Sequence, residues 1–217
     1  ILADERTQYL EQLLTSLQPP SYQPRLPLTV HLVDTPTINA AILPGGNVLI
    51  MSGLLAAVAS ENELAFVLAH ELGHFEARDP LKALGRSLVF LSLASTLGLA
   101  PTPSNGASTV VSLTTNLNEL HYSRQQESAA DHYALSLIVQ RYAHGGHSLD
   151  FFKRLQKKQT ELGSLAYQPE LLSTHPLTQK RIHRLKQLAA EQGWSLEGDA
   201  TPLPEGLACP NFAKCNL

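Results

Sequence analysis

The chain has 217 residues, of which 43% are hydrophobic and 16% charged, and its formal net charge is −3 with neutral histidines. This composition excludes a disordered chain, and the absence of a dense Lys/Arg stripe argues against nucleic acid as the main partner. We expect one domain over residues 1–195, opened by a helix and linker at 1–24, and a C-terminal tail over 196–217.

The first part of the chain predicts one helix and a small sheet. Residues 3–17 carry leucines at helical spacing, and the Pro-rich stretch PPSYQP ends that pattern. Three short segments rich in β-formers follow at 28–34, 38–43 and 47–52, with a Pro-Gly-Gly turn between the last two. We predict that these segments pair as a small antiparallel sheet.

The remaining chain predicts mainly helices. Ser60 stands three residues before Glu63, which is the spacing of a capping box, and this pair opens the helical stretch ENELAFVLAHELGHFEA. We expect a short helix near 53–59 and longer ones over 80–98, 116–142, 148–162 and from Pro176 to about 191. The predicted fold class is therefore α+β and mainly helical.

Residues 70–74 read HELGH on one of these helices. Positions i and i+4 lie on the same face of a helix, so His70 and His74 can bind one ion. Glu71 lies about 100° round the helix from His70 and can reach a metal-bound water instead. This is the H-E-x-x-H arrangement of two zinc ligands and a general base. The alternative is an amphipathic helix with two histidines that serve packing only.

A catalytic zinc needs a third protein ligand, and the stretch ESAAD at 127–131 supplies a candidate. Glu127 can face the ion, and Asp131, one turn later, can accept a hydrogen bond from a ligand histidine. The small residues Ser128, Ala129 and Ala130 allow the two helices to approach closely. Alone, the two carboxylates would indicate a solvated helix face; beside HELGH they indicate one zinc site.

Four segments, in chain order, carry a wider resemblance: NAAILPGGNVLIMSGLL, HELGHFEARD, YSRQQESAAD and THPLTQKRI. Together they resemble the HtpX-like/CAAX-protease family of gluzincin zinc metallopeptidases, most closely its soluble or lipid-anchored bacterial envelope members. The resemblance implies a zincin-like fold with two metal-binding helices. It also implies one zinc ion per chain, held by His70, His74 and Glu127, with Glu71 as the catalytic base.

The same resemblance implies roles for three further residues. Asp131 would orient His70. His175, in the THP segment, would lie near the metal-bound water or the developing oxyanion. Arg181, in the QKRI segment, would brace the site against Glu127 or the substrate carbonyl. The histidines outside these segments are interpreted as surface or loop residues.

The implied activity is a zinc-dependent metalloendopeptidase that hydrolyses unfolded or misassembled proteins in envelope quality control. Its polypeptide substrate would bind as an extended strand along Asn39, Ala40 and Ala41, where Ala41 replaces the aromatic residue common in the family. Two alternatives remain open: a zinc-stabilised, chaperone-like binding protein with little proteolysis, and a zinc peptidase restricted to short peptides. A binding protein would tolerate the loss of Glu71, whereas a peptidase would not.

The location is inferred from the two ends of the chain. Cys209 and Cys215 predict a local disulfide, the alternative being two reduced thiols. We interpret the start at Ile1 as the loss of a signal or anchor, which favours the periplasm or the outer membrane.

The apolar run at 88–100 is too short to span a bilayer, so we expect a core or groove-lining helix, or association with a membrane surface. We hypothesise that residues 80–118 gate the site.

Overall fold

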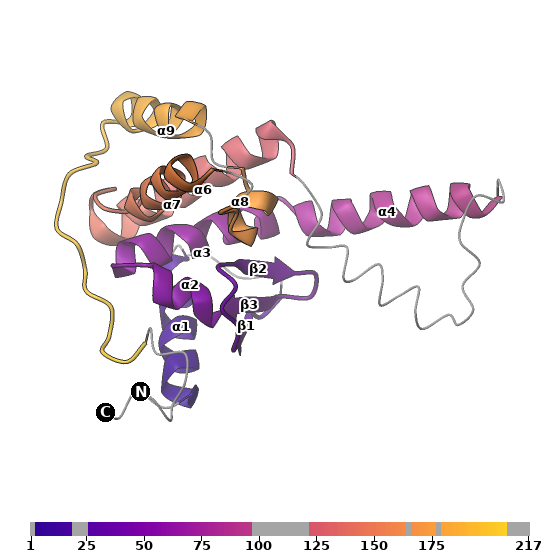
Figure 1. Ribbon diagram of the computed structural model, residues 1–217, viewed down its shortest axis with the longest axis horizontal. Coiled ribbons are helices and arrows are strands. Elements are labelled where there is room, and N and C mark those ends of the chain that lie inside the picture. The colour runs from indigo at the N-terminus through magenta and orange to yellow at the C-terminus, as the bar shows by residue number, and fades with distance from the viewer. Residues whose placement is uncertain (1–2, 19–25, 97–121, 164–165, 177–178, 208–217) are drawn as a thin grey trace.

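The protein is described by a computed structural model that covers residues 3–18, 26–96, 122–163, 166–176 and 179–207. In chain order its elements are α1 (Ala3–Leu17), β1 (Thr29–Val33), β2 (Ala40–Leu43), β3 (Asn47–Met51), α2 (Ser52–Ala57), α3 (Glu61–Glu76), α4 (Asp79–Thr96), α6 (Arg124–Tyr142), α7 (Asp150–Leu162), α8 (Glu170–Thr174) and α9 (Gln179–Gln192). Figure 1 shows the sheet on one side of α3, the helices α6, α7 and α9 on the other, and α4 projecting from the body. The predicted α+β, mainly helical fold is confirmed.

The three strands form one mixed sheet in the order β1-β3-β2. β2 and β3 are antiparallel, and their turn contains Gly45 and Gly46 at φ values of 96° and 84°, which glycine adopts without strain. The prediction of an antiparallel sheet is wrong for β1, which runs parallel to β3. Residues 34–39 carry the chain past the position of β3, so β1 and β2 lie on opposite sides of it. β2 is consequently an edge strand.

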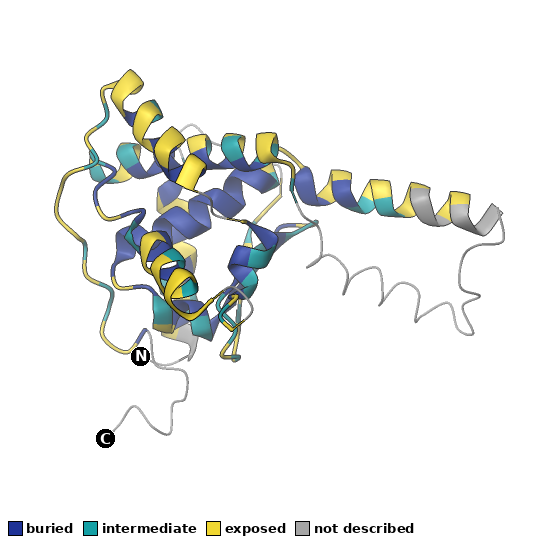
Figure 2. Ribbon diagram, turned by 45° about the horizontal axis from the view of Figure 1, so that its top comes forward, coloured by how far each residue is buried: buried dark blue, intermediate teal, exposed yellow. Residues whose placement is uncertain are grey.

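α3 lies at the centre of the molecule, and every residue from Glu61 to His74 is buried. Figure 2 shows this helix in dark blue, whereas α4 is mostly exposed beyond its first turns. The predicted helix over HELGH is confirmed, but it is buried all round rather than amphipathic. The leucines that predicted α1 face this core and are all buried: Leu10, Leu13, Leu14 and Leu17.

The helix boundaries differ from the predictions where local caps decide them. Ser60 accepts a hydrogen bond from the Glu63 N–H at 3.3 Å as predicted, but the Glu63 carboxylate accepts from Ala59 N–H at 2.6 Å, one residue earlier than in a capping box. The long helix predicted from 116 begins at Arg124, because Ser123 forms a complete capping box with Gln126. α8 was not predicted, since its five residues are too few for a helical period.

The segment after α9 lies against the start of α3. Thr201 accepts a hydrogen bond from the Glu61 N–H at 2.8 Å and donates its own N–H to Asn62 Oδ1 at 2.8 Å. The predicted disulfide between Cys209 and Cys215 lies outside the described residues, as does the hypothesised gating segment beyond α4. Among the described residues, no helix is long and apolar enough to cross a membrane.

Candidate metal centre

α3 and α6 pack side by side and bring HELGH opposite Glu127 (Figure 1). Gly73 faces Ala130 at the crossing, where a Cβ on Gly73 would come within 2.9 Å of the Ala130 Cα. No ordinary side chain fits that distance. The close approach expected from the small residues of ESAAD is thus present, and it depends equally on the glycine of HELGH.

Four buried side chains converge between these helices: His70, His74, Glu127 and His175. The Nε2 atoms of His70 and His74 are 3.2 Å apart, and the Glu127 carboxylate oxygens lie 3.5 Å from the first and 3.2 Å from the second. One donor atom of each of the four residues lies within 4.8 Å of all the others. The sequence-predicted ligands therefore meet at one point, and His175 joins them.

This donor set fits a zinc ion. Zinc takes nitrogen and oxygen ligands at about 2.0–2.1 Å in a tetrahedron, which places neighbouring ligand atoms about 3.3 Å apart. The spacings among His70, His74 and Glu127 match that value. Two imidazole nitrogens that face each other at 3.2 Å would repel through their lone pairs if nothing lay between them, whereas a cation between them satisfies both. The donor set is therefore one that could hold a zinc ion.

A buried carboxylate lies behind each of the two histidines of HELGH. His70 Nδ1 is 3.2 Å from Asp131 Oδ1, as the sequence suggested, and His74 Nδ1 is 3.0 Å from Asp79 Oδ2. A carboxylate on Nδ1 fixes the tautomer that leaves Nε2 able to bind metal. Arg78, with φ of 57°, makes the tight turn between α3 and α4 that returns Asp79 to His74.

The sequence reasoning missed Asp79, although it quoted the segment HELGHFEARD. The only available signal was an acidic residue five positions after His74. Five residues would place Asp79 on a different face if the helix continued, so the contact exists only because α3 ends at Glu76. The predicted helical stretch ends at Ala77, one residue beyond the observed end, but the tight turn at Arg78 that returns Asp79 to His74 was not evident from the pattern.

Arg181 links the carboxylates on α6. Its Nε and Nη2 donate to Asp131 Oδ2 and Oδ1 at 2.8 and 2.7 Å, a bidentate pair, and Nη1 lies 2.5 Å from Glu127 Oε2. Burial alone would raise the pKa of Asp131, but Arg181 and His70 outweigh it and hold that pKa below its ordinary value. Burial would also raise the pKa of Glu127. Hydrogen bonds from His175, His70 and His74 outweigh that effect and hold the pKa well below its ordinary value. Both carboxylates are therefore ionised at neutral pH.

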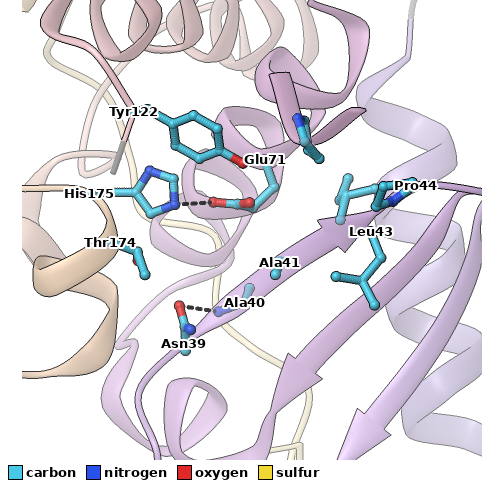
Figure 3. Close-up of a pocket in the computed structure, with 11 residues that line it drawn as sticks. Asn39, Ala40, Ala41, Leu43, Pro44, Glu71, Tyr122, Thr174 and His175 are labelled. Atoms are coloured by element: carbon cyan, nitrogen blue, oxygen red, sulfur yellow. Dashed lines mark hydrogen bonds and ion pairs between the residues drawn. The ribbon is translucent and has the colours of Figure 1, made fainter. Parts of the chain in front are cut away.

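A narrow groove of about 40 Å³ passes the site between β2 and the metal-binding residues (Figure 3). Glu71 and His175 face each other across it, with Glu71 Oε1 3.3 Å from His175 Nε2. Tyr122, which the sequence reasoning also missed, lines the same groove and stacks on His74 with ring centroids 4.0 Å apart. The predicted residues Asn39, Ala40 and Ala41 form its floor.

Within the described part of the chain no strand pairs with the second edge of β2, and this edge faces the groove. Asn39 C=O accepts the Met51 N–H at 3.2 Å, and in an antiparallel ladder such bonded residues alternate along the strand. The ladder therefore uses the peptide groups of Asn39 and Ala41, and those of Ala40 and Ile42 point away from β3. The Ala40 N–H accordingly donates to the side chain of Asn39 at 3.0 Å rather than to the sheet. An extended peptide can pair with this edge.

The other described histidines lie away from the centre, as expected. His31 contacts Asn47 at 2.9 Å on the strands, and His147 contacts Asp150 at 2.9 Å on the surface. His144 contacts the Gly146 N–H at 3.1 Å, and His132 lies near Trp194. His121 lies outside the described residues.

Comparison with known proteins gives an independent view of the chain. The model of peptidase family M48 matches residues 4–189. The mitochondrial metalloendopeptidase OMA1 of Saccharomyces cerevisiae is 32% identical over 163 residues, which cover 73% of this chain and 46% of that protein. The beta-barrel assembly-enhancing protease of Yersinia pestis is 29% identical over 184 residues, which cover 81% of this chain and 37% of that protein. The chain thus spans about half or less of the length of these relatives.

Proposed function

The chain belongs to peptidase family M48, and from this we propose that it is a zinc-dependent metalloendopeptidase that cleaves extended polypeptide segments. The resemblance to gluzincin metallopeptidases that four sequence segments carried is confirmed at the level of the family. The observation that carries the activity is the position of Glu71, which faces the substrate groove directly beside a buried His-His-Glu donor set.

We propose that His70, His74 and Glu127 hold the zinc ion. Asp131 orients His70, and Asp79 orients His74 in the same way. The support is geometric, since each carboxylate oxygen lies within hydrogen-bonding distance of the ring nitrogen that faces away from the ion. The peptidase domain is proposed to span residues 1–195, with residues 196–217 as a tail.

The proposed chemistry is hydrolysis of a peptide bond. A zinc ion held by these residues would polarise a water molecule and lower its pKa towards neutrality. Glu71 takes the proton of the attacking water and delivers it to the leaving amine. His175, whose Nε2 faces Glu71, donates a hydrogen bond to the oxyanion that forms on the scissile carbonyl, and the Tyr122 hydroxyl is a second donor on the same groove. Arg181 keeps Glu127 ionised and in place.

The substrate is proposed to lie along β2 and to pair with the peptide groups of Ala40 and Ile42. Main-chain pairing of this kind adds a strand to a sheet edge and depends little on sequence. It requires an extended segment, so unfolded or misassembled proteins are suitable substrates and tightly folded ones are not. Loss of the usual aromatic at Ala41 changes a side chain of this strand but leaves its main-chain pairing available.

The proposed setting is the bacterial envelope, in the periplasm or at the outer membrane, in protein quality control. The likeness to the beta-barrel assembly-enhancing protease of Yersinia pestis supports it. The likeness to OMA1, which is named as mitochondrial, shows that related chains also work in another compartment. Fractionation of cells of the source organism, with an antibody against this chain, tests the setting: recovery in the cytoplasmic fraction would contradict it.

The activity is tested with wild-type protein and Glu71→Gln on unfolded casein, with zinc content measured in parallel. Glu71→Gln keeps the zinc ligands, so we expect full zinc content and a loss of turnover of at least about a thousandfold. Glu161→Gln, an exposed change on α7, is the control and should cleave normally. Binding of casein without cleavage by the wild type would favour a chaperone-like protein. Cleavage of short peptides but not of casein would favour a peptidase restricted to short substrates.

A further inference from the structure

A second cavity, of about 520 Å³, opens where the groove along β2 ends. Its lining consists of Leu26, Pro44, Gly45, Phe75, Glu76, Arg78, Pro80 and Leu81. Pro44 and Pro80 also line the groove of the metal centre, so the two spaces adjoin. Figure 3 shows Pro44 at the end of β2 that lies farther from His175. A peptide that follows β2 past Glu71 therefore reaches this cavity.

The walls of the cavity are mainly apolar. Leu26 and Leu81 are 45% and 53% exposed, and Phe75 and the two prolines complete the surface between them. An exposed leucine alone needs no explanation, but two that flank a concave apolar space favour binding of an apolar group. The volume is ample for a leucine, methionine or phenylalanine side chain.

One wall of the cavity is connected to the metal centre through the start of α4. Leu81 lies in the first turn of α4, two residues after Asp79, which is 3.0 Å from His74. The tight turn at Arg78 fixes the start of α4 relative to α3. The cavity therefore has a fixed position relative to the proposed metal ligands. Its described lining includes no residue of α4 beyond Leu81.

The distance along β2 from Ala41 to Pro44 indicates which substrate residue reaches the cavity. Glu71 reaches the groove opposite Ala40 and Ala41, and Pro44 lies three residues further on (Figure 3). Three residues of an extended strand span about 10 Å. A substrate that pairs antiparallel to β2, the more stable pairing, runs with its N-terminal side towards Pro44.

We propose that this cavity is a specificity subsite that takes a bulky apolar side chain about three residues N-terminal to the scissile bond. The inference rests on the proposed peptidase function and adds to it a preference that main-chain pairing alone does not supply. The lining also includes Glu76 and Arg78, both exposed, so charged side chains border the apolar surface.

The test uses four peptides built on the casein site that the protein cleaves fastest, identical except for Leu, Phe, Lys or Asp three residues before the scissile bond. Wild-type protein should cleave the Leu and Phe peptides with kcat/KM at least about tenfold above the Asp peptide. Leu81→Asp and, separately, Leu26→Asp should each remove that preference while zinc content and Tm stay unchanged. Val89→Asp is the control, because Val89 is 61% exposed on the same helix but does not line the cavity.

Three results would overturn the subsite: equal cleavage of all four peptides by the wild type, an equal loss on all four in Leu81→Asp, or a preference that appears only on the C-terminal side of the scissile bond. Failure of the peptidase function looks different. In that case zinc-loaded wild-type protein cleaves neither casein nor any of the peptides, and the subsite falls with it.

Discussion

His70 and His74 are each held from behind by a buried carboxylate, but the two carboxylates have different neighbours. Asp131 is paired with the buried Arg181, whereas the cation nearest Asp79 is Lys82 at 3.5 Å, whose side chain is largely exposed. Burial raises the pKa of Asp79, but hydrogen bonds from Gln126 and His74 outweigh it and keep the pKa below its ordinary value. Asp79 is therefore an ionised acceptor that depends mainly on His74 and Gln126.

Asp79→Asn should weaken zinc binding by about ten- to a hundredfold, because the amide orients the His74 ring less strongly than the carboxylate does. Competition with a chromogenic chelator measures the affinity. Asp150→Asn provides a matched control, since Asp150 makes the same kind of contact with His147 at 2.9 Å on the surface. Equal zinc affinity in Asp79→Asn and wild type would remove Asp79 from the centre.

Tyr122→Phe should lower kcat about tenfold with little change in KM or zinc content. The ring still stacks on His74, so only the hydroxyl, proposed as an oxyanion donor, is lost. Steady-state kinetics on one of the casein-derived peptides separate kcat from KM. Tyr167→Phe is the control, because Tyr167 contacts Lys158 and does not line the groove. A rise in KM alone would show that the hydroxyl binds the substrate in its ground state.

The crossing of α3 and α6 sets the spacing of the proposed zinc ligands, since α3 carries both histidines and α6 carries Glu127. The glycine within HELGH is needed at that crossing for its size. Its hydrogen atom lies where a methyl group would meet Ala130 at 2.9–3.3 Å. A small shift of the helices would change the distance from Glu127 to the two imidazoles, so packing and metal binding are coupled here.

Gly73→Ala should consequently lower both Tm and zinc affinity, although the same change in an open helix position stabilises by about 1 kcal/mol. Gly85→Ala in α4 supplies that comparison, because a Cβ there meets no described atom within 4 Å and should leave zinc affinity unchanged. Thermal unfolding and chelator competition measure the two effects. If both alanine variants behaved alike, the close contact with Ala130 would not limit the helix spacing.

Glu61 connects the start of α3 to two other helices. Its carboxylate accepts hydrogen bonds from Tyr9 of α1 at 2.6 Å and from Arg141 and Tyr142 of α6 at 2.9 and 2.7 Å. Burial raises its pKa, but these three donors outweigh burial and lower the pKa below the ordinary value. A lowered folded-state pKa means that the stabilisation is present above the pKa of the unfolded state and is lost as the pH falls through the folded-state pKa.

Glu61→Gln should therefore cost about 2 kcal/mol in the free energy of unfolding at pH 7, and the cost should shrink below about pH 4. Urea unfolding of variant and wild type at each pH gives the difference in their free energies of unfolding. Effects common to both proteins, such as loss of zinc in acid, cancel in this difference. Glu161→Gln should differ little from wild type at either pH. A cost that stayed constant down to pH 3 would show that charge plays no part.

Local patterns predicted the elements better than their connections. The helix over HELGH, the three strands and the leucine face of α1 follow from spacing alone, and the predicted site residues 70, 74, 127, 131, 175 and 181 do lie together. The parallel pairing of β1 could not be predicted, because it depends on which side of β3 the chain crosses. Asp79 was missed because its contact depends on the tight turn at Arg78 that directs the chain back towards His74, and no pattern indicates the direction of that turn.

The metal centre draws on segments that are distant along the chain. Its described side chains come from α3, the start of α4, α6, the end of α8 and the start of α9: His70, Glu71, His74, Asp79, Glu127, Asp131, His175 and Arg181. Four of these are buried carboxylates, and Arg181 supplies a single positive charge. Buried charges of one sign repel unless a cation offsets them, so a zinc ion would stabilise the assembly as well as the reaction.

Removal of zinc should therefore destabilise the whole fold. A ligand present at a hundred times its dissociation constant contributes about 2.7 kcal/mol, and for a chain of this size that corresponds to a fall in Tm of roughly 5–10 °C. Differential scanning calorimetry before and after dialysis against a chelator measures the fall, and zinc added back should reverse it. Glu127→Ala, which loses one ligand, should melt at a reduced temperature that the chelator no longer changes. A wild-type Tm that is indifferent to the chelator, in protein shown to have lost its zinc, would mean that the helices hold the carboxylates together without help from the ion.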